Sequence, residues 1–391
     1  MPKEVGFIHN EPNRIEEFDK AVEYFKANPT IKKLSRKQEE LHLHNSYIKL
    51  DDGTILALSS KILEGGTIAV GQYARCKKVM DRDGNLFVVK IETSNTENQQ
   101  QETAILSNLK ELLRATKTEI ERKDSSKKYY THMNDLGKSL DTSLWLVDSD
   151  YKPSLARKIA WKIHQLHSGD LSSTHIGYVH LDIKPSNMVL DSENEIHLID
   201  FGTARLVLSE DLSFVISTSI YQPSEYADNQ LTQEEYEQRV GPRLALLGLR
   251  GIDQFALKRT LFLPSPAPRD PCDFGACLFS REEYSALPER IQAILDTTNM
   301  EIALTQRDTP LQLATLFLLM ECHLNIDIFD QLDSKAQVNL CQIASKYTLP
   351  ISEQEEEEEG DEHVIAMKQD ITIYIESLGI DLTDPIRGPS A

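Results

Sequence analysis

The sequence predicts an α+β fold in which a small lobe of antiparallel strands precedes a larger helical lobe. In the first third of the chain, short apolar runs alternate with turn signals at residues 51–53, 64–66 and 81–85. From about residue 153 onward, apolar residues recur at helical spacing. A chain of 391 residues is long enough to build both lobes around sizeable cores.

The first lobe is expected to begin with a helix over residues 13–27, capped by Asn13. A hairpin over Tyr47–Leu58 follows, and then two strands, Ala74–Met80 and Leu86–Glu92, separated by an Asp-Arg-Asp-Gly-Asn turn. A helix from about residue 97 to 118 is predicted to close this lobe. The hinge to the second lobe is placed near residues 133–137.

The second lobe is predicted to contain a helix around residues 155–166, short strands and turns over 178–207, and further helices to about residue 347. The apolar segment Leu311–Leu324 is too short to cross a bilayer, so it is interpreted as a buried helix and no membrane span is expected. The glutamate run over 352–362 predicts a disordered linker, and residues 364–378 predict one more short helix.

Charge and cysteine content exclude several classes of function. The formal net charge is −20, and residues 351–391 contribute −10 of it, from twelve acidic against two basic residues. Such an acidic chain is a poor candidate for nucleic-acid binding, which depends on positive charge. The five cysteines include no CxxC pair, which favours a reducing, cytoplasmic location over a disulfide framework or a zinc site. No N-terminal segment has the pattern of a secretory signal peptide.

Two polar segments carry the strongest chemical signal: His-Leu-Asp-Ile-Lys-Pro-Ser-Asn at 180–187 and Asp-Phe-Gly at 200–202. Phosphoryl transfer needs a carboxylate to accept a proton, oxygen ligands for Mg²⁺ and a cation near the transferred phosphate. Asp182, Asn187, Asp200 and Lys184 are the residue types for these tasks. Any one of them could be an ordinary turn residue, but both segments in this order are much harder to explain that way.

This pair of motifs resembles the eukaryotic-like Ser/Thr protein kinase family. The resemblance implies the bilobal kinase fold, ATP with Mg²⁺ or Mn²⁺ as cofactors, Asp182 as catalytic base, Lys184 beside it, and Asn187 and Asp200 as metal ligands. Lys184 is typical of the Ser/Thr branch of the family rather than of the tyrosine branch. The implied activity is transfer of the γ-phosphate of ATP to serine or threonine of a protein substrate.

Further matches lie upstream, in the predicted first lobe. Lys90, inside the apolar strand Phe87–Ile91, resembles the lysine that anchors ATP, and Glu102 is its expected partner, with Glu97 as a second choice. The phosphate-covering loop is poorly matched: Gly71 is the one of three family glycines that is present, and Ala74 takes the place of another. Met133 resembles the residue before the hinge.

Downstream, Thr218, Tyr221 and Glu225 resemble the end of the kinase activation segment, and Asp253 resembles the helix residue that supports the catalytic-loop backbone. Leu181 replaces the arginine that usually grips an activation-loop phosphate. We therefore expect activity to be independent of phosphorylation in that loop. The candidate phosphorylation positions are Ser209, Ser213, Ser217 and Thr218.

The predicted division of the chain is an N-terminal extension (1–55), a kinase N-lobe (56–133), a C-lobe (134–300), a helical extension (301–350) and an acidic tail (351–391). Two other functions stay open. A pseudokinase or nucleotide-binding scaffold would fit the poor glycine-rich loop. A small-molecule kinase acting on a sugar, an antibiotic or a lipid headgroup would share the same phosphotransfer residues.

The divergent activation segment and the additional terminal segments resemble effector kinases that bacteria of the Legionella type inject into host cells. That resemblance implies secretion into a host cell and a host activator. If the activator is a polyanion, the lysines at 123, 127 and 128 are candidates to bind it, although such clusters are commonly exposed surface.

Overall fold

Two units divide the chain in the computed structural model, Met1–Asp135 and Leu136–Ala391. The division falls inside the stretch 133–137, where the sequence places a hinge. The five-part division predicted above remains a prediction in its finer boundaries. The structure describes residues 6–8, 10–59, 67–70, 74–93, 97–109, 116–121, 127–143, 147–209, 221, 234, 238, 241–262, 277–296, 308–347 and 357–382.

The first unit is built on one antiparallel sheet. Its strands follow the order β1-β2-β3-β5-β6-β8-β7, and β4 also pairs with β5. The strands are β1 (Lys33–Leu34), β2 (Ser46–Lys49), β3 (Ile55–Leu58), β4 (Thr67–Val70), β5 (Ala74–Met80), β6 (Leu86–Glu92), β7 (Thr116–Glu121) and β8 (Lys127–Asn134), and the helices are α1 (Glu11–Ala27) and α2 (Glu97–Asn108). The predicted hairpin turns at 51–53 and 81–85 are confirmed, with Gly53 and Gly84 at positive φ.

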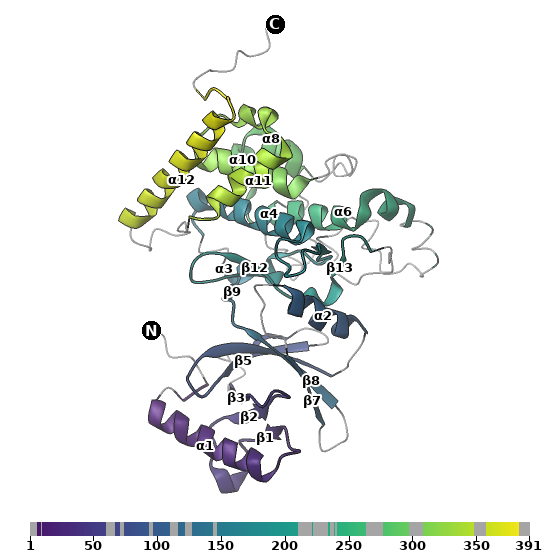
Figure 1. Cartoon of the computed structure of the whole chain (residues 1–391), viewed down its shortest axis with the longest axis vertical. Helices are drawn as coiled ribbons and strands as arrows, with labels where there is room; N and C mark the ends of the chain where they lie inside the picture. The colour runs from purple at the N-terminus through teal and green to yellow at the C-terminus, as the bar shows by residue number, and fades with distance from the viewer. Residues whose placement is uncertain are drawn as a thin grey trace. The chain divides into compact units, whose positions relative to one another are not determined.

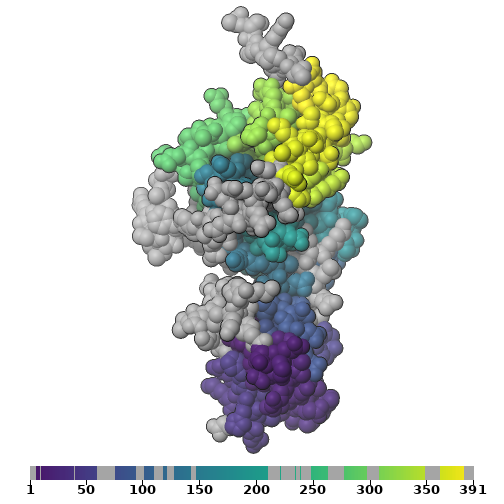
Figure 2. Space-filling model, turned by 90° about the vertical axis from the view of Figure 1, so that its left-hand side faces the viewer, coloured from purple at the N-terminus to yellow at the C-terminus, as the bar shows by residue number. Residues whose placement is uncertain are grey.

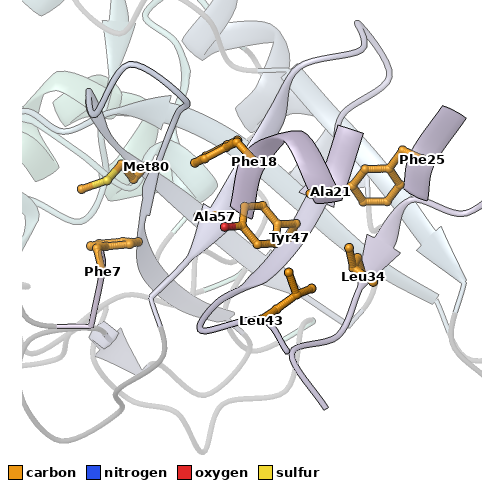
Figure 3. Packing of buried hydrophobic residues seen from close by; sticks show 9 residues of the cluster. All are labelled: Phe7, Phe18, Ala21, Phe25, Leu34, Leu43, Tyr47, Ala57 and Met80. Carbon is orange, nitrogen blue, oxygen red and sulfur yellow. The ribbon is translucent and has the colours of Figure 1, made fainter. Parts of the chain in front are cut away.

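Helix α1 packs against the first strands of the sheet (Figure 1). Its N-cap is Asn10, whose side chain accepts a hydrogen bond from the Asn13 N–H, so the prediction of Asn13 as the cap is wrong. The helix begins earlier because Pro12 suits its first turn. Figure 3 shows the apolar side of α1 meeting the strands around Tyr47. The buried residues of this cluster are Phe7, Phe18, Ala21, Phe25, Leu34, Leu43, Tyr47, Ala57 and Met80.

The predicted helix over 97–118 is wrong over residues 116–118. Helix α2 ends at Asn108, and Thr116–Glu121 forms strand β7, which pairs along β8. Alternating β-branched residues at 116, 118 and 120 favour a strand, and Thr118 and Ile120 are buried.

The second unit is mainly helical. It contains two small sheets, one with the strand order β12-β11-β9 and one formed by β10 and β13. Its elements are β9 (Lys138–Ser139), α3 (Leu140–Ser143), α4 (Lys152–Ser168), β10 (Tyr178–Val179), β11 (Met188–Leu190), β12 (Ile196–Leu198), β13 (Arg205–Leu206), α6 (Gly241–Leu261), α7 (Arg281–Ala286), α8 (Glu289–Leu295), α10 (Thr309–Glu321), α11 (Ser334–Ala344) and α12 (Glu357–Ser377). Short 3₁₀ helices lie at Pro185–Asn187 and Phe201–Thr203.

Helix α10 packs along α4 and confirms the predicted buried helix. Arg157 on α4 and Glu321 on α10 form a buried ion pair, with Nε 2.7 Å from Oε2. Helix α12 packs on α11 at the surface, where Figure 2 shows it in yellow. It begins at Glu357, inside the acidic run, so the prediction of a disordered linker is wrong from that residue onward. Glutamates near a helix N-terminus are favoured by the helix dipole. No helix in the described part of the chain is long and apolar enough to cross a membrane.

Candidate active site

Lys90 and Glu102 lie together inside the first unit. Lys90 is in the middle of β6, between Cys76 on β5 and Thr131 on β8. Its Nζ is 2.8 and 2.9 Å from the two carboxylate oxygens of Glu102 on α2. Both side chains are buried, at 9% and 4% exposure, so each needs the other's charge. The expected pairing is present, and the role of the pair toward a nucleotide stays a prediction.

Glu92 is a second buried carboxylate beside Lys90 that the sequence analysis missed. Its Oε1 lies 3.8 Å from the Lys90 Nζ, and the residue is 3% exposed. The signal that could have found it is the strand period, because residues two apart in a strand share a face. Lys90 is therefore held between two carboxylates from different elements.

The other predicted nucleotide-binding residues are placed only in part. Gly71 lies outside the described residues, between β4 and β5. Ala74 begins β5, opposite Glu92 on β6. Met133 is half-buried on β8 and pairs with Val88 on β6. Their contribution to nucleotide binding stays a prediction.

Asp182, Lys184 and Asn187 converge in the second unit. The Lys184 Nζ is 2.7 Å from Asp182 Oδ2. The Asn187 Nδ2 donates to the Asp182 carbonyl oxygen at 2.8 Å and to Asp182 Oδ2 at 2.9 Å. One carboxylate oxygen thus meets both an ammonium and an amide, which holds the Asp182 side chain in one orientation. Because the Asn187 amide nitrogen makes these bonds, its oxygen is the atom left to meet a metal ion.

Asp253 holds the backbone just before Asp182. Its fully buried carboxylate accepts the N–H groups of His180 and Leu181, each at 2.7 Å. The predicted support of this backbone by Asp253 is present, and the catalytic role of the segment stays a prediction. Within α6 it follows a break at Gly248, whose φ of 61° and ψ of 166° are not helical. A buried carboxylate that accepts two backbone hydrogen bonds also helps Leu181 to keep its φ of 65°, which is unusual for a leucine.

His167 on α4 is a further partner of Asp253 that the sequence analysis did not identify. Its Nε2 lies 2.9 Å from Asp253 Oδ2, and the ring is buried. Since a carboxylate only accepts, Nε2 carries the proton in this hydrogen bond. A histidine near the end of a helix gives no signal in the sequence that it contacts a residue 86 positions away.

Asp200 follows the hairpin β11–β12 that connects it to Asn187. The Ile199 N–H donates to the Asn187 carbonyl at 2.9 Å, and His180 Nε2 donates to the Ile199 carbonyl at 2.9 Å. The His180 ring also contacts Phe201, with centroids 4.9 Å apart. Asp200 itself is exposed with a φ of 63°, in the left-handed region that aspartate tolerates better than most residues.

Asn187 and Asp200 fit Mg²⁺ in the chemistry of their donor atoms. In enzymes that transfer phosphoryl groups, Mg²⁺ is held by one or two protein oxygens together with substrate phosphates and water, rather than by a complete protein cage. The described residues contain no cluster of three or more His, Cys, Asp or Glu side chains arranged for a metal ion. An amide oxygen and a carboxylate at the two ends of one hairpin suit such a partial site.

Tyr221 is the one described residue of the predicted activation-segment match, because Thr218 and Glu225 lie outside the described residues. Its side chain is buried. Burial raises the pKa of its hydroxyl, and the nearby charges of Cys277, Asp141 and Asp182 raise it further. The field of Asp182 therefore reaches this tyrosine, which stays protonated at neutral pH.

Comparison with known proteins shows what this chain is similar to. Residues 63–240 match the family model for the protein kinase domain. This part of the chain is therefore similar to protein kinase domains. The chain is also similar to a probable LRR receptor-like serine/threonine-protein kinase of Arabidopsis thaliana, with 28% identity over 137 residues. That match covers 33% of this chain and 12% of the plant protein.

Proposed function

We propose that this chain is an ATP-dependent protein kinase that transfers the γ-phosphoryl group to serine or threonine of a protein substrate. The observation that carries the proposal is the arrangement of Asp182, Lys184 and Asn187 on a backbone held by Asp253. The match to the family model supports a kinase in general. The Ser/Thr assignment rests on Lys184 and on the similarity to the plant kinase.

The proposed mechanism assigns one task to each residue. Asp182 accepts the proton of the attacking hydroxyl, and Lys184 offsets charge that develops on the transferred phosphate. Asn187 and Asp200 would hold Mg²⁺, which when bound neutralises phosphate charge. Lys90 would orient the phosphates while Glu102 keeps its ammonium in place.

Leu181 supports the proposal that activity does not require a phosphate on the activation loop. In its place the family usually has an arginine that pairs with this phosphate, whereas Leu181 is an apolar side chain at 1% exposure. A buried leucine cannot bind a phosphate. The catalytic-loop backbone is instead held by the permanent carboxylate of Asp253.

The test is phosphotransfer from labelled ATP to generic protein substrates, with intact mass to detect autophosphorylation. Asp182→Asn and Lys90→Met should each lower kcat/KM by at least about a hundredfold. The first variant removes the proposed base, and the second removes the proposed contact with the ATP phosphates. Asp150→Asn, at an exposed position, is the matched control and should leave the rate unchanged. Alanine at Ser209, Ser213, Ser217 and Thr218 should also leave it within about twofold, since no phosphate partner is lost.

The same assay separates the alternatives. Nucleotide binding without any transfer would favour a pseudokinase, and transfer to sugars, aminoglycosides or lipid headgroups but not to proteins would favour a small-molecule kinase. Loss of activity in the alanine variants, with normal folding, would contradict independence from loop phosphorylation.

A cytoplasmic location, secretion into a host cell and a polyanionic activator remain predictions of the sequence. For the activator, Lys123 lies outside the described residues. Lys127 forms an exposed ion pair with Glu119 across β7 and β8, with Nζ 2.7 Å from Oε1. That pair reduces the charge available to a polyanion at this position.

A further inference from the structure

Strand β6 has two faces, and the face opposite Lys90 is also buried. Lys90 and Glu92 point to one side. Phe87, Val89 and Ile91 alternate with them, and Val89 is fully buried. What packs behind Val89 therefore determines where the backbone of Lys90 lies.

The hairpin β2–β3 supplies that packing. Ile48 and Leu56 are direct cross-strand partners and are both fully buried. They belong to the cluster that contains Val89, and this cluster draws on both ends of the sheet. Its members are Ile48, Leu50, Leu56, Leu58, Val79, Val89, Ile120 and Tyr130. The first hairpin and the last strands of one sheet thus share a core, which requires the sheet to curl back over β6.

Polar contacts attach this hairpin layer to the sheet. Near the hairpin tip, the Asp51 N–H donates to Thr118 Oγ1 on β7 at 3.0 Å. From β1, the Lys33 Nζ donates to the Tyr130 hydroxyl on β8 at 3.3 Å. Helix α1 is attached separately: Arg14 donates to the carbonyl oxygens of Arg82 and Asp83, at 3.1 and 3.2 Å, in the turn that leads into β6.

The outer side of the hairpin is covered in turn by α1. Tyr47 and Ala57 lie on the other face of the hairpin, in the cluster with Phe18 and Phe25 (Figure 3), against which Leu86 at the start of β6 also packs. The Tyr47 hydroxyl donates to the buried Glu17 of α1 at 2.9 Å. Residues 11–58 therefore form two layers, the hairpin that shares a core with Val89 and α1 on the other face of that hairpin, and both lie outside the matched kinase domain, which begins at residue 63.

We propose that residues 11–58 are a positioning layer for Lys90, acting through the contact of Ile48 and Leu56 with the Val89 cluster. The inference rests on the proposed role of Lys90 in binding ATP. Protein interiors are close-packed, so a cavity behind Val89 lets the strand shift toward it, and Lys90 shifts with its neighbour. A displacement of about 1 Å at a phosphate-orienting group is enough to weaken its function by a large factor.

Leu56→Ala and Leu34→Ala provide a matched pair of variants. Both leucines are fully buried in strands of this layer, but Leu56 belongs to the Val89 cluster and Leu34 to the α1 cluster. Measured well below both melting temperatures, Leu56→Ala should raise KM for ATP by about tenfold with kcat within about twofold of wild type. Leu34→Ala should lower the melting temperature and leave KM unchanged. Leu56→Met should restore the wild-type KM.

Hydrogen exchange of the full-length chain provides a readout that does not depend on catalysis. Amides of residues 86–92 should exchange faster in Leu56→Ala than in Leu34→Ala. If Leu56→Ala does not fold, Ile48→Val takes its place in both measurements. An equal rise in KM in both variants, or no rise in either, together with equal β6 exchange, would overturn the proposal. If the wild type neither binds ATP nor transfers phosphate, the proposed function fails, and exchange alone still decides whether the layer fixes β6.

Discussion

At the scale of single residues, a buried carboxylate that accepts two consecutive backbone N–H groups can fix a loop without touching the substrate. Asp253 does this for His180 and Leu181, and it accepts a third hydrogen bond from His167. Each bond is charge-assisted in a dry environment, where such bonds are strongest. The orientation of Asp182, which directly follows Leu181, therefore depends on a residue 71 positions away.

We predict that Asp253→Asn lowers kcat by at least about tenfold and destabilises the fold by about 2–4 kcal/mol. An amide keeps one acceptor oxygen but turns its NH₂ toward a backbone N–H, which leaves that donor unpaired. Activity and urea unfolding should be measured together. Asp170→Asn, at an exposed position near the end of the same α4 helix that carries His167, is the control. A stable variant with full activity would show that the loop holds its shape without Asp253.

The residues that sequence reasoning identified are those whose chemistry limits the choice of residue type. A carboxylate two residues before a lysine, and a buried lysine that needs a carboxylate, leave short and recognisable patterns around Asp182 and Lys90. Glu92 and His167 were missed because nothing local distinguishes them from an ordinary strand or helix residue. Their importance comes from packing that brings Glu92 beside Lys90 and His167 beside Asp253.

At the scale of elements, Glu283 connects the start of α7 to the start of α4. It completes a capping box with Ser280 and accepts two hydrogen bonds from the Lys152 Nζ at 2.8 Å. Burial by itself would raise the pKa of Glu283. Hydrogen bonds from Lys152, Ser149 and Ser280 outweigh that effect and lower the pKa from 4.5 to about 2.

We predict that Glu283→Gln costs about 1 kcal/mol of unfolding free energy at pH 7, after allowance for solvent screening of a partly exposed pair. Because the folded-state pKa is the lower one, this stability is present above about pH 4.5 and disappears as the pH falls toward 2. Urea unfolding of the variant and the wild type across that window measures the difference. A difference that stays constant with pH would contradict the assignment.

Turn chemistry made the elements of the first unit predictable, and the ends of helices were the least predictable. Asp-Asp-Gly and Asp-Gly-Asn specify tight turns, so both hairpins were placed correctly. Residues 97–118 contain the helix α2 and the start of strand β7. Residues 116–118 form a strand because they pair with β8, and such pairing depends on residues distant in the sequence. Helix α12 likewise includes acidic residues that composition alone assigns to a linker.

At the scale of the whole molecule, the matched kinase domain does not contain all the packing partners of its own elements. Helix α4 lies inside residues 63–240, but its partner α10 does not. Arg157 is 2% exposed, and its carboxylate partner Glu321 lies far beyond the matched range. Asp253 and the hairpin behind β6 are also outside it. A boundary set by family resemblance therefore follows the sequence motifs rather than the cores that hold them.

We predict that a fragment limited to residues 63–240 does not fold cooperatively. Without α10, the face of α4 that α10 covers is exposed to water, and Arg157 loses its counter-ion Glu321. Without β2 and β3, the face of β6 that carries Val89 is exposed to water, and without α6 the backbone before Asp182 loses both hydrogen bonds to Asp253. These losses together approach the total stability of a typical domain, about 5–15 kcal/mol. Circular dichroism and thermal unfolding of the fragment beside the full chain measure this directly. A sharp unfolding transition in the fragment would mean that the catalytic motifs carry enough core of their own, and that the flanking layers serve positioning alone.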